Sequence, residues 1–173
     1  VYEAAEELSS FVDALSNWYL RRSRRRYWKS EQDIDKQDAY ATLYQALTTV
    51  TNLVAPFVPF LAEEIYQNLV RKPFGNQQPE SVHLCDFSVP DEAAIDHKLS
   101  DEMAFVRSIV SLGLRVRTDH KLKVRQPLSL AEIVLSDESY RAALENYRDL
   151  IAEELNVQEV TFVGSDEGHV RYA

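Results

Sequence analysis

The sequence predicts a mainly α-helical protein, with an antiparallel four-helix bundle followed by a small α/β unit. Two observations lead to this fold class. Apolar residues recur at the spacing of helical faces through most of the first 119 residues, and the segments after residue 128 read as strand, helix and strand. We therefore expect a helical domain over residues 1–119, in which residues 72–98 form a long connection, and an α/β appendage over residues 120–173.

The first expected element is a long amphipathic helix. Its apolar residues follow one helical face, and they are Leu8, Val12, Leu15 and Tyr19. No glycine or proline interrupts the segment before Lys29. Because the chain begins at Val1 without a methionine and enters this helix at once, we expect it to be a piece of a longer protein.

Two further helices follow from capping residues and prolines. Asp35 or a polar neighbour is expected to cap a second helix, which ends before Pro56. Pro59 suits the first turn of a third helix, where Glu63 and Glu64 lie near the positive end of the helix dipole.

The long connection precedes the fourth helix. Prolines and amides fill residues 72–98, and residues 81–87 read as an extended piece. The start signals Ser100 to Glu102 predict a fourth helix that carries Gly113 in its interior. Glycine there costs about 1 kcal/mol relative to alanine, so we expect another helix to approach closely at that point.

The α/β unit begins where the hydrophobic period changes to two. Lys121 to Arg125 alternate basic and apolar residues, as a strand would. Beyond it we expect a strand over Leu130–Leu135, a helix over Glu138–Leu155, a parallel strand over Val157–Val163 and a short third strand after Gly168.

Positive charge is concentrated in two places, although the formal net charge of the chain is −9. Six basic residues fall within nine positions with no acid among them: Arg21, Arg22, Arg24, Arg25, Arg26 and Lys29. A second stretch contains one acid, Asp119, among the basic residues Arg115, Arg117, Lys121, Lys123 and Arg125. Segregated positive charge of this kind is typical of a protein that binds a phosphate backbone at a defined place.

The first basic cluster continues the apolar seam of its helix. Burying unpaired cations costs several kcal/mol, so we expect the helix to extend past the bundle and to present them to a groove or to solvent. Tyr27 and Trp28 lie among them as candidates for base stacking, and Asn17 is a candidate for a base edge. Three less specific interpretations stay open. The arginines pair with acids elsewhere, Asn17 pairs locally with Arg21, and the second basic stretch is a protected sheet edge.

The residue types do not favour catalysis. The four histidines are scattered singly, the four glycines form no phosphate loop, and no metal-ligand spacing occurs. The single cysteine, Cys85, suits a reducing cytosol, and no run of about eighteen apolar residues predicts a membrane span. We therefore expect no catalytic or metal site and no cofactor in this chain, and a cytoplasmic location without membrane attachment.

Three strings carry a resemblance to a known family. The run from Leu15 to Trp28 resembles the first helix of the anticodon-binding domain of isoleucyl-tRNA synthetases, of class I. The string Leu53 to Tyr66 is similar to the following helix pair. Lys121–Leu128 and Glu153–Val157 resemble the later α/β part, particularly in the eukaryote-like branch.

The resemblance implies a module that holds the anticodon stem-loop of tRNA(Ile). The parent enzyme would be an isoleucine–tRNA ligase, which joins isoleucine to tRNA with ATP and Mg²⁺. Its signatures His-Ile-Gly-His and Lys-Met-Ser-Lys-Ser are absent here, so the chain alone is expected to be non-catalytic, monomeric and joined to a catalytic domain of the same polypeptide. The expected tRNA-binding residues are Asn17, Arg21, Arg22, Arg24, Arg25, Arg26, Tyr27, Trp28, Lys29, Lys121, Lys123 and Arg125.

One function of another class is compatible with the same residues. A helical bundle with a cationic helix can dock an acidic protein partner or a sibling domain and bind no RNA. Titration with tRNA and with an unrelated polyanion at two salt concentrations separates the two functions.

Overall fold

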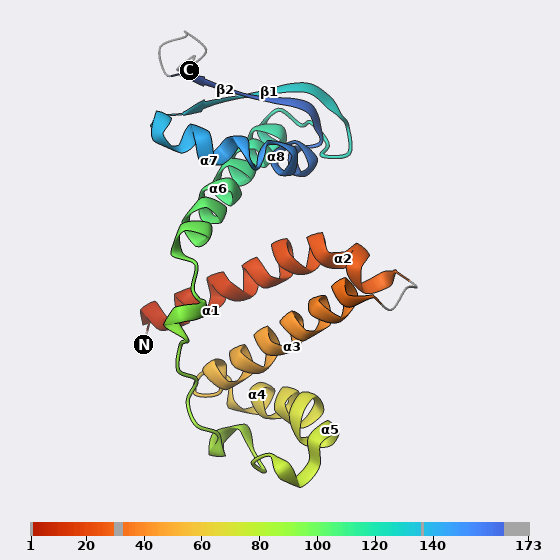
Figure 1. Cartoon of the computed structure of the whole chain (residues 1–173), viewed down its shortest axis with the longest axis vertical. Coiled ribbons are helices and arrows are strands. Elements are labelled where there is room, and N and C mark those ends of the chain that lie inside the picture. Colours follow the sequence, from red (N-terminus) through yellow and green to blue (C-terminus); the bar gives the residue numbers. More distant parts are fainter. Residues whose placement is uncertain (1, 30–32, 136, 165–173) are drawn as a thin grey trace. The chain divides into compact units, whose positions relative to one another are not determined.

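The computed structural model describes residues 2–29, 33–135 and 137–164. The chain divides into two compact units, residues 1–90 and residues 91–173 (Figure 1). Helices make up the first unit, and helices with a two-stranded sheet make up the second. The predicted helical bundle and small α/β unit are confirmed. Over the described residues, no helix has the length and apolar character needed to cross a membrane.

The first long helix is confirmed as far as Trp28. It consists of α1 (Tyr2–Ala14), a π-helical segment (Leu15–Leu20) and α2 (Arg21–Trp28). The segments are continuous, because Ala14 and Leu20 at the two junctions keep helical backbone angles. The helix ends at Lys29, whose backbone is extended with ψ of 144°.

The second helix, α3 (Ile34–Val54), lies beside α2 in unit 1 (Figure 1). Its cap is Asp33, whose Oδ1 accepts a hydrogen bond from the Lys36 backbone N–H at 2.9 Å. Asp35 instead occupies the first turn. The extended backbone of Asp33, with ψ of 172°, allows its side chain to fold back over the helix end.

The third helix begins at Pro59, as its sequence predicts. α4 (Pro59–Tyr66) continues through a π-helical segment (Gln67–Arg71) into the short α5 (Lys72–Phe74). The buried residues of this corner form one apolar cluster: Ala55, Ala62, Tyr66 and Val82.

The connection after α5 is tied to α4 by polar side chains. Glu63 accepts hydrogen bonds from the Ser81 hydroxyl at 2.7 Å and from the Val82 backbone N–H at 3.1 Å. Partial burial alone would raise the pKa of Glu63, but these hydrogen bonds and one from Gln67 lower it below its ordinary value. The extended piece predicted over residues 81–87 is wrong in part, because Val82–Leu84 forms a 3₁₀ turn whose N-terminus Ser81 caps.

The fourth helix belongs to the second unit. α6 (His97–Asp119) starts three residues before the predicted position, because Asp96 caps it by accepting from the Leu99 N–H at 2.9 Å. α6 packs against α8 (Arg148–Leu155). For this reason the division between the compact units falls before α6, and it does not coincide with the predicted domain boundary after residue 119.

The close approach predicted at Gly113 is confirmed. A Cβ atom at Gly113 would lie 2.6 Å from Cδ2 and 2.9 Å from Cδ1 of Leu155, which is on α8. A Cβ at that distance would force the Leu155 side chain to shift, so the missing side chain of glycine allows α6 and α8 to pack this closely.

The predicted strands pair in parallel. β1 (Leu128–Leu135) pairs with β2 (Val157–Gly164), with Leu130 opposite Glu159. The predicted helix over residues 138–155 is divided into a 3₁₀ turn (Glu138–Tyr140), α7 (Arg141–Glu145) and α8. The predicted third strand lies outside the described residues.

The strand predicted over Lys121 to Arg125 is wrong. The segment consists of turns, and Lys121 has a left-handed backbone with φ of 56°. The buried Arg117 side chain holds this segment by donating hydrogen bonds to the carbonyls of Lys123 and Gln126. A pattern of alternating residues predicts a strand here because it cannot reveal such a tertiary contact.

Candidate nucleic-acid interface

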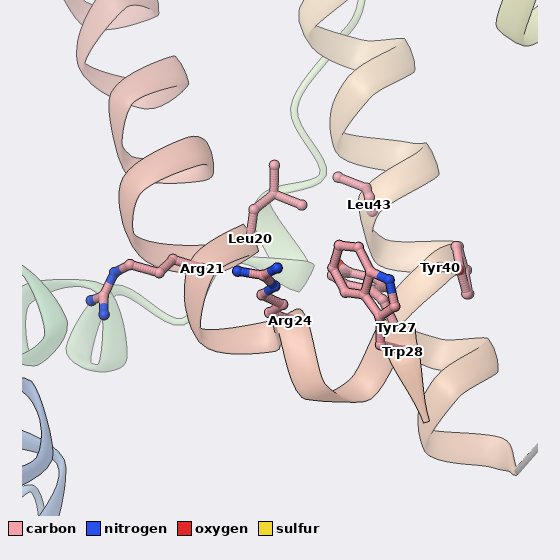
Figure 2. Close-up of a pocket in the computed structure, with 7 residues that line it drawn as sticks. All are labelled: Leu20, Arg21, Arg24, Tyr27, Trp28, Tyr40 and Leu43. Atoms are coloured by element: carbon pink, nitrogen blue, oxygen red, sulfur yellow. The ribbon is translucent and has the colours of Figure 1, made fainter. Parts of the chain in front are cut away.

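A groove between α2 and α3 collects several of the predicted binding residues. It is open to solvent, has a volume of about 780 Å³ and is lined by Leu20, Arg21, Arg24, Tyr27, Trp28, Tyr40 and Leu43 (Figure 2). We call it the α2 groove. The end of the long helix supplies five of these side chains, and α3 supplies Tyr40 and Leu43.

Aromatic rings form much of the α2 groove. The Trp28 side chain is 74% exposed, and Tyr40 is 51% exposed. Tyr27 packs edge-on against Tyr40 with ring centroids 5.2 Å apart, and burial raises the pKa of Tyr27 to about 12. Trp28 therefore offers a ring to a ligand, whereas Tyr27 is committed to the contact between the helices.

Two arginines of the cluster face solvent, and one of them lies beside these rings. The guanidinium carbon of Arg24 lies 5.0 Å from the centroid of the Trp28 ring, and Figure 2 shows both side chains at the groove. Arg24 and Arg25 are exposed, and no carboxylate of the described residues lies within ion-pairing distance of either. A cation beside an exposed indole suits a ligand that has both a phosphate and a base.

Arg21 and Arg22 belong to the same helix but make other contacts. Arg21 extends away from the aromatic residues in Figure 2, and its Nε donates to the Asn17 carbonyl at 3.0 Å. The guanidinium carbon of Arg22 lies 5.7 Å from the centroid of Trp18, one turn earlier.

The last two cations of the cluster bind carboxylates. Arg26 Nε lies 2.8 Å from Asp35 Oδ1, and Lys29 Nζ lies 2.6 Å from Asp33 and 2.7 Å from Asp35. Hydrogen bonds with Asp33 and then Asp35 raise the pKa of Lys29, and the hydrogen bond from Lys29 lowers the pKa of both carboxyls. Arg26 and Lys29 thus pair with acids, which is an alternative that the sequence left open, and their role in RNA binding stays a prediction.

Asn17 lies away from the α2 groove. Its Nδ2 donates to Asp13 Oδ1 at 2.5 Å, and it lines a separate groove with Val12 and Phe57. The sequence left open a local pairing of Asn17 with Arg21, but the side chain of Asn17 pairs with Asp13, and Arg21 binds only its backbone carbonyl. The role of Asn17 in RNA binding stays a prediction.

The second basic stretch divides into one buried and four exposed members, of which Arg115 lies on α6. Arg117 is 3% exposed and is bound to backbone carbonyls, so it serves the fold of unit 2. Lys121, Lys123 and Arg125 are exposed on the turns that follow α6.

Comparison with known proteins identifies the family of this chain. Residues 1–134 match the family described as the anticodon-binding domain of tRNA ligase. The chain belongs to this family. The match includes all of unit 1, and thus the α2 groove, together with α6 and most of β1.

The curated relatives are much longer than this anticodon-binding domain. Isoleucine–tRNA ligase of Dehalococcoides mccartyi strain CBDB1 is 49% identical over 156 residues, which are 90% of this chain and 15% of that protein. The enzyme of the same name from Clostridium novyi strain NT is 48% identical over 166 residues, and that from Protochlamydia amoebophila strain UWE25 is 44% identical over 167. The chain spans about 15% of the length of these relatives.

Sequence reasoning missed three residues that line the groove in this anticodon-binding domain, Leu20, Tyr40 and Leu43. Tyr40 follows the buried Ala39 on α3, and an exposed aromatic beside a buried alanine gives no signal of its own. Only the packing of α3 against α2 brings Tyr40 beside Tyr27. Within the residues that the structure describes, no group of His, Cys, Asp or Glu side chains has the arrangement of a metal site.

Proposed function

We propose that this domain binds the anticodon stem-loop of tRNA(Ile) through the α2 groove, as part of an isoleucine–tRNA ligase. The observation that carries the proposal is the exposed Trp28 ring with the Arg24 guanidinium beside it. The family match supports tRNA as the ligand of the domain. The names of the relatives support isoleucine as the amino acid of the parent enzyme.

The two kinds of side chain have different tasks. Arg24 and Arg25, with Arg21 and Arg22 on the preceding turn, contact phosphates and position the loop. Trp28 stacks on an unpaired base, which is worth about 1–3 kcal/mol per base in single-stranded binding. Phosphates are common to all tRNAs, so discrimination comes from the base that stacks and from its neighbours.

Aminoacylation itself is proposed for the rest of the parent polypeptide. ATP and Mg²⁺ belong there, because the two nucleotide-binding signatures are absent from this chain. The partners of the domain are then the anticodon stem-loop and the remainder of the same polypeptide, in a monomeric cytoplasmic enzyme.

The main test compares two double variants that remove equal charge. Changing Arg24 and Arg25 to alanine is expected to weaken tRNA(Ile) binding about tenfold at physiological salt and to flatten the salt dependence by about 1.5 units. Changing Arg26 and Lys29 to alanine is expected to alter the slope by less than about half a unit, because these cations already bind carboxylates. Fluorescence anisotropy at several salt concentrations measures both quantities.

Two outcomes of the same titrations would contradict the proposal. Equal slopes for the wild type and the Arg24/Arg25 variant would show that the α2 groove does not contact phosphates. A chain that binds tRNA no better than an unrelated polyanion would support the alternative, a bundle that docks an acidic protein.

A second prediction concerns the carboxylate that covers the end of α2. Asp35→Asn is expected to strengthen tRNA binding severalfold and to steepen the salt slope by about one unit, because it removes the negative charge that pairs with Arg26 and with Lys29. Asp38→Asn is the matched control. It removes the same charge from an exposed position of α3 where no cation of the described residues is bound. Equal effects of the two changes would contradict this role of Asp35.

A further inference from the structure

The turns after α6 are held by one buried guanidinium. Arg117 donates from Nη1 to the carbonyls of Lys123, at 3.2 Å, and Gln126, at 3.0 Å. Its Nη2 donates to the carbonyl of Asn156 at 3.0 Å. A guanidinium has five donors in a rigid fork, so a single side chain can fix several carbonyls.

Asn156 holds the same segment from the other side. It follows α8 in the left-handed conformation, with φ of 49°. Its Nδ2 donates to the Val124 carbonyl at 2.9 Å, and its own carbonyl accepts from the Leu128 N–H at 3.1 Å. Residues 121–128 and 153–157, which the sequence singled out separately, thus meet in one structure.

These contacts orient the peptide groups of the turn. The Gln126 N–H donates to the Lys123 carbonyl at 2.9 Å, which closes a turn over Lys123–Gln126. The carbonyls of Lys123, Val124 and Gln126 are therefore directed to Arg117 and Asn156. The backbone N–H groups of Lys123, Val124 and Arg125 have no acceptor among the described residues.

Three cationic side chains belong to the same segment as these N–H groups. Lys121, Lys123 and Arg125 are exposed, and none has a carboxylate within ion-pairing distance in the described part of the chain. Positive side chains and free N–H donors therefore occur on one turn, while its carbonyl oxygens are sequestered. This arrangement favours an anion.

We propose that the turn Lys121–Gln126, which we call the cationic turn, binds an RNA phosphate, with Arg117 and Asn156 as positioning residues. The proposal rests on the proposed function and adds a second contact point, in unit 2, to the α2 groove of unit 1. It replaces the interpretation of this stretch as a protected sheet edge, because the segment is not a strand.

The first test is a comparison of two single charge removals. Arg125→Gln removes a cation from the cationic turn, and Arg115→Gln removes one from an exposed position of α6 outside it. With the complete chain and a tRNA(Ile) transcript, Arg125→Gln is expected to lower affinity about fivefold and to flatten the salt slope by about 0.8 units. Arg115→Gln is expected to change the slope by less than about 0.3 units. Equal changes would overturn the proposal.

The second test changes the position of the turn without changing charge. Arg117→Lys keeps the positive charge but lacks the planar guanidinium whose two terminal nitrogens bind the three carbonyls, so we expect about a fivefold loss of tRNA affinity with the helical circular dichroism retained. Unchanged affinity in a folded Arg117→Lys protein would remove the positioning role. If this variant does not fold, the comparison of Arg125 with Arg115 still decides whether the cationic turn contacts RNA.

The Arg24/Arg25 variant separates this proposal from the proposed function. A flatter slope for that variant with no effect of Arg125→Gln would reject the cationic turn alone. No effect of either would reject both the cationic turn and the α2 groove as RNA contacts.

Discussion

Gly113→Leu is expected to lower the free energy of unfolding by about 3 kcal/mol. A Cβ at this position would lie 2.6 Å from a methyl carbon of Leu155, and Leu155 is only 4% exposed, so it has little room to move aside. The helices α6 and α8 would have to separate, which would expose apolar surface of the unit 2 core. Urea denaturation followed by circular dichroism measures the change.

Two further variants show whether this contact is the cause. Gly113→Ala gains about 1 kcal/mol of helix propensity. It places a single carbon atom against the methyl groups of Leu155, so the net loss in the free energy of unfolding is expected to be small. Combining Gly113→Leu with Leu155→Ala is expected to cost less than the sum of the single changes, because Leu155 is the group that clashes. Additive costs, or a neutral Gly113→Leu, would contradict the close packing of α6 on α8.

Tyr66→Ala is expected to destabilise the protein by about 4 kcal/mol. Tyr66 is 6% exposed within the apolar cluster of unit 1, where it packs with Ala62 and Val82. Its hydroxyl also donates to the Pro79 carbonyl at 2.9 Å, which ties the connection to α4. The variant therefore creates a cavity and releases the connection, and urea denaturation reports both as lost stability.

The matched control, Tyr66→Phe, keeps the ring and removes the hydrogen bond. Its expected cost is about 1 kcal/mol. Burial raises the pKa of Tyr66 to about 12, whereas an unfolded tyrosine ionises near about 10. The folded state thus favours the neutral phenol. The free energy of unfolding of the wild type should therefore fall as the pH rises between these two values, and it should fall less in Tyr66→Phe. Equal costs for the alanine and phenylalanine variants would contradict the packing role of the ring.

Local signals predicted the helices of this chain well. The apolar seam from Leu8 to Tyr19 continues without a breaker, and the helix runs to Trp28 as expected. Pro59 begins α4, and Gly113 lies where α6 meets α8. Each of these features depends on helical periodicity, on the fixed φ of proline or on the missing side chain of glycine, which are properties of single residues and their spacing.

Contacts made across turns of the chain produced the differences. Alternation over residues 121–125 predicted a strand, but Arg117 and Asn156 hold that segment as turns through its carbonyls. For the basic cluster the sequence left pairing with acids open, and Asp33 and Asp35 bind its last two members. Neither outcome can be read from spacing, because each depends on where the chain returns after a turn.

By itself the sequence determined the helical class, the parallel pair of strands, the family and the place of the positive charge. The tertiary structure decided which of the cations are available. It paired Arg26 with the start of α3, placed Arg24 beside the exposed ring of Trp28 and buried Arg117 beneath the cationic turn. The physical reason is that a charge belongs to a residue, whereas its pairing and its contact with water depend on the groups that folding brings beside it.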